Sequence, residues 1–273
     1  MPLDVIGPCL CEAKYLGVVG IALQDLAVFF IQMIKCFTIA FCLDNQRHLQ
    51  KVLVTKSNFM GRELKKMDKK VNFTAMKNGT REDYQLLAEL EKPFLSLTAD
   101  RVLNELREAG MATLEGYKIT RLEHGLQSGT RAMRDGADID WIVGALLHDI
   151  GDGLAPQNHD RMSAEVIRPF VRWDVAWTVE HHGIFQMIYY AHHYNWDRNA
   201  RDKFRDHPLF KTCEEFCERW DQSSFDPDYP TEPLETFEPM VRQVFSRKAY
   251  DPAVLREGFI SSLTRKEEKM RST

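Results

Sequence analysis

Histidine and aspartate residues recur along the middle of this chain in an order that suits metal chemistry. His148 and Asp149 stand side by side in the run ALLHDIGD, residues 145–152. One histidine precedes the pair and three residues follow it: His124, then His159, His182 and Asp221. Neutral imidazole and carboxylate together suit iron, manganese or zinc, whereas calcium prefers an oxygen shell. The set therefore predicts a metal centre.

The adjacent imidazole and carboxylate are expected to line an internal cleft. Leu146, Leu147 and Ile150 give one side of the presenting helix an apolar character. Burying both polar groups without partners is costly. One interpretation is a hydrogen-bonded His-Asp pair in the core. The other is a metal site, in which a carboxylate can bridge two ions about 3.5–4 Å apart.

The elements that position these residues are predicted to be helices. Helical spacing, capping residues and breakers indicate nine segments: 81–92, 98–110, 118–134, 138–149, 159–167, 173–194, 211–222, 235–245 and 252–263. Thr98 and Asp138 are expected to begin their helices, and Pro93 and Gly151 to end theirs. Because the sequence lacks alternating strand patterns with hairpin signals, the fold class is predicted to be all-α.

The composition is that of a globular protein and excludes some classes. The 273 residues are 44% hydrophobic and 28% charged, and six are cysteines. A net charge of −4 argues against nucleic-acid binding through phosphate neutralisation. The cysteines form neither a disulfide framework nor a Cys-x-x-Cys site, and Cys213 and Cys217 are expected on a buried helix face. We therefore expect a reducing, cytoplasmic environment.

The chain is predicted to divide into three parts. Residues 1–70 form an N-terminal extension of unknown role, partly hydrophobic and then basic. Asp25 and Lys35 interrupt its apolar stretch, which falls short of the roughly 20 residues of a spanning helix. Membrane association, a further packed or mobile helix, and a gene-model artefact stay open as alternatives. Residues 71–263 form the helical domain, with the metal core at about 114–250, and residues 264–273 a mobile charged tail.

Four segments carry a family resemblance. The order H, HD, H, H, D on helices resembles the HD-domain superfamily, whose fold is a helical bundle with bound metal. The segments LEHGLQSG, GALLHDIGD, VEHHGIF and CERWDQ resemble more narrowly the mixed-valence diiron oxygenases. That branch includes organophosphonate-cleaving oxygenases and, more distantly, myo-inositol oxygenase. The resemblance covers residues 114–250 and implies an HD-domain bundle with an N-terminal extension.

The resemblance also implies how the metal ligands divide. One iron would take His124, His148 and Asp221, the other would take His159 and His182, and Asp149 would bridge the two. His181 competes for the last position, but the family histidine follows a glutamate by two residues, as His182 follows Glu180.

Further site residues are implied in the same way. Tyr117 would occupy an iron position until substrate displaces it; the alternative is an ordinary core or surface tyrosine. Asp152 and Gln186 replace a histidine and a lysine that hold the phosphonate in the known enzymes. Asp152, together with aromatic residues in 173–196, would suit a cationic or quaternary ammonium group. Arg161 is a candidate partner for a substrate anion.

These residues lead to two hypotheses of function. The first is an oxygenase with two iron ions, which uses O2 to cleave a C–P or C–C bond. Its substrate would be a small hydroxylated molecule such as an amino- or trimethylammonio-hydroxyethylphosphonate. The alternative is an HD-type phosphohydrolase that uses Mn²⁺ or another divalent metal on a nucleotide or small phosphomonoester. A third class, a catalytically inactive regulatory protein, would require that the ligands do not converge.

Overall fold

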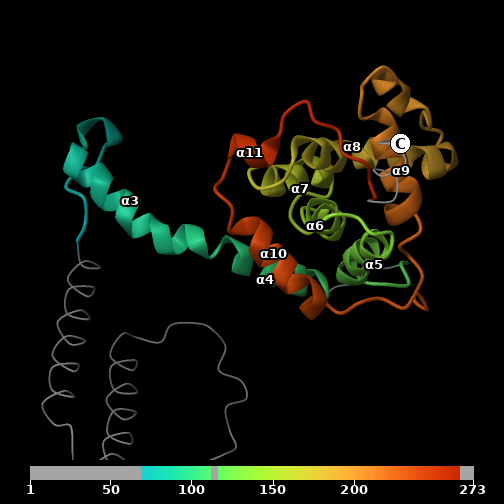
Figure 1. Cartoon of the computed structure of the whole chain (residues 1–273), viewed down its shortest axis with the longest axis horizontal. Helices are drawn as coiled ribbons and strands as arrows, with labels where there is room; N and C mark the ends of the chain where they lie inside the picture. The colour runs from blue at the N-terminus through green and yellow to red at the C-terminus, as the bar shows by residue number, and fades with distance from the viewer. Residues whose placement is uncertain (1–68, 112–115, 265–273) are drawn as a thin grey trace, which may run out of the picture. The chain divides into compact units, whose positions relative to one another are not determined.

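The computed structural model describes residues 69–111 and 116–264, and all regular structure in those ranges is helical (Figure 1). The prediction of an all-α fold is confirmed. The α-helices are α3 (Arg81–Ser96), α4 (Thr98–Ala109), α5 (Arg121–Arg134), α6 (Ile139–Leu147), α7 (His159–Ile167), α8 (Trp173–Tyr190), α9 (Phe210–Phe216), α10 (Leu234–Phe245) and α11 (Pro252–Leu255). Shorter helical turns are η1 (Met76–Asn78), η2 (Ala191–Tyr194), η3 (Ala200–Phe204) and the π-helical η4 (Cys217–Asp221).

The chain divides into two compact units, Met1–Leu86 and Leu87–Thr273. In the described part of the first unit, Asp83 is the buried residue of α3. It accepts hydrogen bonds from the main-chain N–H groups of Asn72 and Thr80. These bonds fix residues 72–80 against the first turn of α3. The predicted role of the hydrophobic N-terminal stretch lies outside the described residues.

The second unit is built around α6, which Figure 1 shows among α5, α7, α8 and α10. Every residue of α6 from Asp140 to Leu147 is buried. Its large side chains, such as Trp141 and Leu147, are fully enclosed, and each contributes about 1.5–3 kcal/mol of burial free energy. The helix that leads to His148 is therefore the rigid centre of the unit.

Close approach of α5 to α6 depends on Gly125. A Cβ at this position would lie 2.7 Å from the carbonyl oxygen of Leu146, nearer than two such atoms can come. With glycine there, the backbones meet one residue after His124 and two residues before His148. This contact brings the two histidines to one place.

Some local predictions are confirmed, but the helix predicted from residue 118 begins at Arg121, where Thr120 and Glu123 form a reciprocal capping box. Asp138 caps α6 through bonds from the N–H groups of Asp140 and Trp141. Cys213 and Cys217 are both buried, as expected.

Other predicted boundaries were wrong. Helix α3 runs through Pro93 to Ser96. Proline has no N–H, but in an exposed helix water can donate instead to the carbonyl that loses its partner. Thr98 is the first residue of α4 and not its cap. α6 ends at Leu147, so His148 and Asp149 follow the helix. The segment 252–263 is helical only to Leu255, because Arg256 takes a left-handed conformation with φ 46°.

Two long predicted helices change their geometry near the end. The segment 173–194 is α-helical to Tyr190 and then continues as η2. The segment 211–222 is α-helical to Phe216 and then becomes the π-helical η4. Among residues 69–111 and 116–264, no helix combines the length and apolar character needed to cross a membrane.

Candidate metal centre

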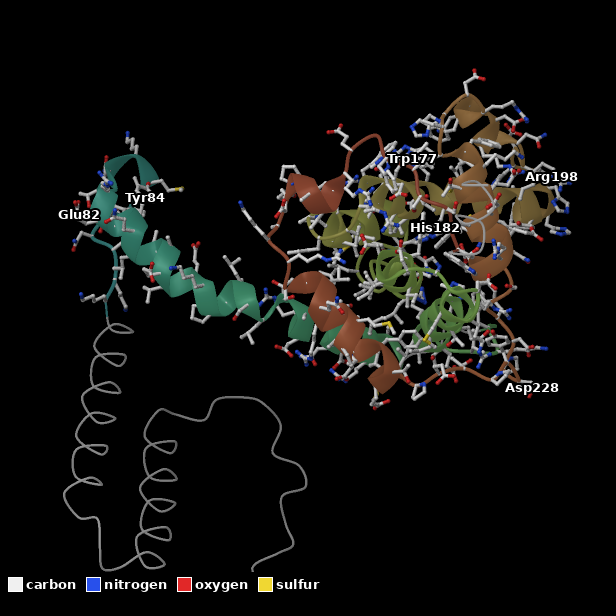
Figure 2. The ribbon with its side chains drawn as sticks, in the orientation of Figure 1. Glu82, Tyr84, Trp177, His182, Arg198 and Asp228 are labelled. Carbon is white, nitrogen blue, oxygen red and sulfur yellow. The ribbon has the colours of Figure 1, made fainter. Side chains whose placement is uncertain are left out.

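The structure brings all six predicted metal ligands together. His124 lies on α5, and His182 lies on α8. Figure 2 labels His182 within the helical part of the chain. His148 and Asp149 follow α6, His159 begins α7, and Asp221 ends η4. Segments nearly a hundred residues apart in sequence thus contribute to one cluster. Their roles as metal ligands stay a prediction.

One half of the cluster is deeply buried. Asp221 Oδ1 lies 3.3 Å from His124 Nε2 and 3.4 Å from His148 Nε2. The exposed fractions are 5% for His124, 0% for His148 and 3% for Asp221. These three residues could hold one metal ion.

The other half centres on Asp149 and is more open. Asp149 Oδ1 lies 3.1 Å from His182 Nε2 and 3.2 Å from His159 Nε2. The second oxygen of Asp149 faces the buried half, at 3.5 Å from His124 Nε2 and 3.6 Å from His148 Nε2. The two oxygens of one carboxylate therefore point to two groups of imidazoles. His148, Asp149 and His182 also satisfy the geometry of a three-ligand group.

Each histidine of the cluster is oriented by the main chain. The Nδ1 atoms face backbone carbonyl oxygens, where a protonated Nδ1 can donate. These contacts are His124 to Ser224 at 2.8 Å, His148 to Ala145 at 2.8 Å, His159 to Pro156 at 3.1 Å and His182 to Val179 at 2.7 Å. In the neutral ring this arrangement leaves the Nε2 lone pair free, which is the usual preparation of a metal ligand.

The donor set fits a cation. His124 Nε2 and His148 Nε2 lie 3.0 Å apart, so in the neutral tautomers two lone pairs face each other. Asp221 Oδ2 is buried and has no hydrogen-bond partner among the described residues. An unpaired buried carboxylate oxygen costs free energy that a bound metal ion would recover. Imidazole and carboxylate donors match a first-row divalent metal.

The charges in the cluster favour protonated histidines, so protons compete with a metal ion for the same ligand atoms. Burial by itself lowers the pKa of His124, but the hydrogen bond to Asp221 and the charge of Asp149 outweigh burial and raise it. The pKa values of His148 and His182 are raised by the same carboxylates against the same burial. Burial raises the pKa of Asp149, and the charge of His148 and contacts with His182 hold it well below its usual value. A metal ion must displace these protons.

The position of Asp221 depends on η4. The π-helical turn begins where α9 ends and closes at Asp221. A π-helical turn inserts one residue into the helical repeat and changes the direction of the side chains that follow. The buried Trp220 and Cys217 anchor the turn in the core. The sequence pattern of a regular helix over 211–222 did not reveal this change.

A cavity of about 900 Å³ opens onto the cluster. Of the additional predicted site residues, Tyr117, Asp152 and Gln186 line this cavity. Tyr117 is 58% exposed and stacks on Phe225, with ring centroids 5.8 Å apart. Phe225 in turn stacks on His124 at 4.4 Å. The rings form a row that leads from the cavity mouth to the buried half of the cluster.

Asp152 is already paired. Its carboxylate forms an ion pair with Arg121, which also lines the cavity. Burial and the charge of Asp149 raise the pKa of Asp152, while Arg121 lowers it. Asp152 is therefore not a free carboxylate that could attract a cationic substrate, because the guanidinium of Arg121 compensates its charge.

Other sequence candidates lie away from the cavity. Arg161 is exposed and is not among the cavity residues, so its placement gives no support to a substrate-binding role. His181 points elsewhere: its ring stacks on Trp177 at 4.1 Å, and Trp177 stacks on His207 at 4.1 Å. Of the adjacent histidines, His182 is the one beside Asp149. Of the aromatic residues in 173–196, Tyr189, Tyr190, Tyr194 and Trp196 line the cavity.

Sequence reasoning missed Phe225 and Gln127. Phe225 is an apolar residue in the polar loop after Asp221, and this contrast is the signal that could have found it. Gln127 is 3% exposed and hydrogen-bonds the main chain of Asp226. Its place on the same helix face as His124 and Arg131, three and four residues apart, was available in the sequence.

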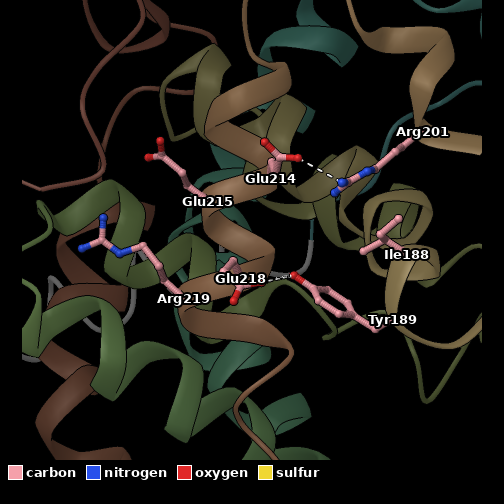
Figure 3. Close-up of a pocket in the computed structure, with 7 residues that line it drawn as sticks. All are labelled: Ile188, Tyr189, Arg201, Glu214, Glu215, Glu218 and Arg219. Atoms are coloured by element: carbon pink, nitrogen blue, oxygen red, sulfur yellow. Dashed lines mark hydrogen bonds and ion pairs between the residues drawn. The ribbon is translucent and has the colours of Figure 1, made fainter. Parts of the chain in front are cut away.

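A second hollow of about 390 Å³ lies beside η3 and α9 (Figure 3). Four of its polar residues are paired: Tyr189 Oη donates to Glu218 at 2.5 Å, and Arg201 binds Glu214 at 2.9 Å. Burial and the hydrogen bond to Glu218 raise the pKa of Tyr189. The hollow is a surface ion-pair region next to the centre and adds no metal ligand.

Comparison with known families agrees with this geometry. Residues 121–221 match the HD domain family. Residues 121–221 form an HD domain. The matched segment begins with α5 and ends at Asp221, so it spans all six residues of the cluster. No curated protein matches the chain. The HD domain and its buried histidine and aspartate residues are those of a metal-dependent enzyme.

Proposed function

We propose that this HD-domain protein is an oxygenase with two iron ions in a mixed-valence state. It would use O2 to cleave a C–P or C–C bond of a small hydroxylated substrate. The observation that carries the proposal is the two-sided contact of Asp149. Its Oδ2 faces His124 and His148, and its Oδ1 faces His159 and His182. Such a shared carboxylate suits a pair of ions about 3.5–4 Å apart.

The six predicted ligands would be shared between two metal ions. His124, His148 and Asp221 would hold one ion, His159 and His182 the other, and Asp149 would be shared. When bound, iron would supply the activation of dioxygen. The Nδ1 contacts with main-chain carbonyls keep the imidazoles aligned, and the buried α6 keeps water from the rear of the cluster. Asp149 sets the distance between the two metal positions.

The cavity suits a small bipolar substrate. Tyr117 and Gln186 offer hydrogen bonds near the cluster, and Lys118 places positive charge on the wall beside the ion pair of Arg121 with Asp152. Tyr194 stacks on Trp196 at 5.0 Å, and such aromatic faces attract alkylammonium groups. An amino- or trimethylammonio-hydroxyethylphosphonate would match both features. Tyr117 would have to leave Phe225 to reach a metal position.

A phosphohydrolase is the second candidate, and one observation favours it. Lys118 lines the cavity that contains the cluster and can bind the oxygens of a phosphomonoester, and Arg121 could do so by giving up its ion pair with Asp152. In that reaction Mn²⁺ or another divalent ion would serve as a Lewis acid. The two reactions differ in their need for O2.

The test uses the full chain loaded with iron under anaerobic conditions and then partly oxidised. We expect a half-integer-spin EPR signal, and O2 uptake with a small hydroxyphosphonate that releases phosphate only when O2 is present. Phosphate release that continues undiminished without O2 would overturn the oxygenase proposal. Two adjacent variants serve as a matched pair: His182→Ala should lose the signal, and His181→Ala should keep it, because His181 stacks on Trp177 instead of facing Asp149.

A further inference from the structure

The segment after Asp221 is fastened to α5 by side chains along one helix face. We call residues 223–226 the strap. Arg131 Nη2 donates to the carbonyl of Ser223 at 2.8 Å, and His124 Nδ1 lies 2.8 Å from the carbonyl of Ser224. Gln127 donates to the carbonyl of Asp226 at 2.8 Å and accepts from its N–H at 3.3 Å. The strap therefore begins two residues after one metal-ligand candidate and orients another.

Phe225 is the residue of the strap whose side chain contacts the metal centre. Its ring stacks on His124 with an interplanar angle of 26° and lines the cavity. Phe225 is 41% exposed, so it is not a core residue that packing alone would require. Its position places an apolar ring over the imidazole that belongs to the buried half of the cluster.

Gln127 is the residue that fixes the strap. Its amide is almost fully buried and uses both its oxygen and its nitrogen on the main chain of one residue, Asp226. A buried amide with both groups satisfied holds a loop in one conformation, and its loss leaves those main-chain groups to seek water. Without these two hydrogen bonds the strap would keep its contacts with Arg131 and His124 at Ser223 and Ser224 but would lose those at Asp226, just after Phe225.

We propose that Phe225 is the cover that limits exchange of the metal ion at His124, His148 and Asp221 with solvent. Gln127 is the positioning residue that holds this cover closed. The inference rests on the metal centre of the proposed function but not on the reaction. A cover slows entry and departure of an ion equally, so it changes the exchange rate without changing affinity. A residue that aligns a ligand changes affinity as well.

The experiment loads the full chain with Zn²⁺ and measures the rate at which a chromogenic chelator removes it, together with the equilibrium Kd. For Phe225→Leu we expect removal to accelerate about tenfold in one kinetic phase, with Kd unchanged. For Gln127→Met, which keeps the side-chain volume, we expect the same phase to accelerate and Kd to rise about tenfold, because Ser224 no longer aligns His124.

Arg134→Ala is the matched control. Arg134 lies on the same helix and contacts Tyr229 and Glu232 further along the same loop, and we expect wild-type exchange. Removal rates within twofold of wild type for both Phe225→Leu and Gln127→Met would overturn the proposal. Equal acceleration in Arg134→Ala would also overturn it, since general loosening of the loop would then suffice. A protein that binds zinc yet consumes no O2 would contradict only the proposed function.

Discussion

The two halves of the metal centre differ in how the fold encloses them. His124, His148 and Asp221 are at most 5% exposed, although His124 and Asp221 touch the cavity. In the other half His182 is also buried, but the side chains of His159 and Asp149 are 27% and 26% exposed in the cavity. A buried set of ligands is organised by the core, whereas an open set is accessible to substrate. The difference suggests a retained ion in the first half and a substrate-facing position in the second.

The largest effect should come from the residue that both halves share. Asp149→Ala removes an oxygen from each side, and without its negative charge the two cations would repel each other. We expect metal content to fall from about two ions per chain to less than one, and activity to fall to background, measured by elemental analysis and O2 uptake. Retention of two ions in this variant would show that the halves are independent.

The contrast in burial predicts unequal effects on stability. In the metal-free protein, His124→Ala should lower the free energy of unfolding by about 1–3 kcal/mol, because it leaves the buried carbonyl of Ser224 without this donor. His159→Ala, at a more exposed position, should change it by less than about 0.5 kcal/mol. Chemical denaturation measures both. Equal losses would contradict the view that one half belongs to the core.

The smallest effect concerns pH and the buried imidazoles. The pKa values of His124, His148 and His182 are raised from 6.5. Protonation of these imidazoles therefore stabilises the metal-free protein. This stabilisation is complete below pH 6.5 and is lost as the pH rises through the pKa values of the folded state. Metal binding needs the neutral rings, so affinity increases over the same range.

The melting temperatures of the metal-loaded and metal-free forms should therefore diverge as the pH rises from about 6 to about 8.5. Thermal denaturation with and without Mn²⁺ at each pH checks this trend. His124→Ala, which removes one buried imidazole, should flatten it. A difference that narrows towards high pH would contradict the assignment of these imidazoles as metal ligands.

Much of the fold followed from local signals, because helices are stabilised by interactions between residues close in sequence. The capping residue Asp138 marks the beginning of α6 where the structure has it. The apolar run before His148 made α6 a central helix, and burial of α6 agrees. The HD order placed six polar residues on helices, and those residues lie in one cluster.

Tertiary structure decided which neighbours face the centre. His181 and His182 are adjacent, and the resemblance favoured His182. The structure places the ring of His181 on Trp177 and that of His182 beside Asp149. Arg121 reaches the cavity and Arg161 does not, although both are basic residues near the motif. The direction of a helical side chain depends on how its helix is rotated against the others, and residues distant in sequence set that rotation.

The sequence by itself therefore determined the helical class, the buried helix that presents the HD pair and the set of candidate ligands. The resemblance implied how those ligands divide around Asp149, whereas the π-helical turn that aims Asp221 and the strap next to His124 came only from the tertiary structure. The physical reason is that these features depend on contacts up to a hundred residues apart, such as that of His124 with Ser224. Such contacts leave no periodic pattern in the chain.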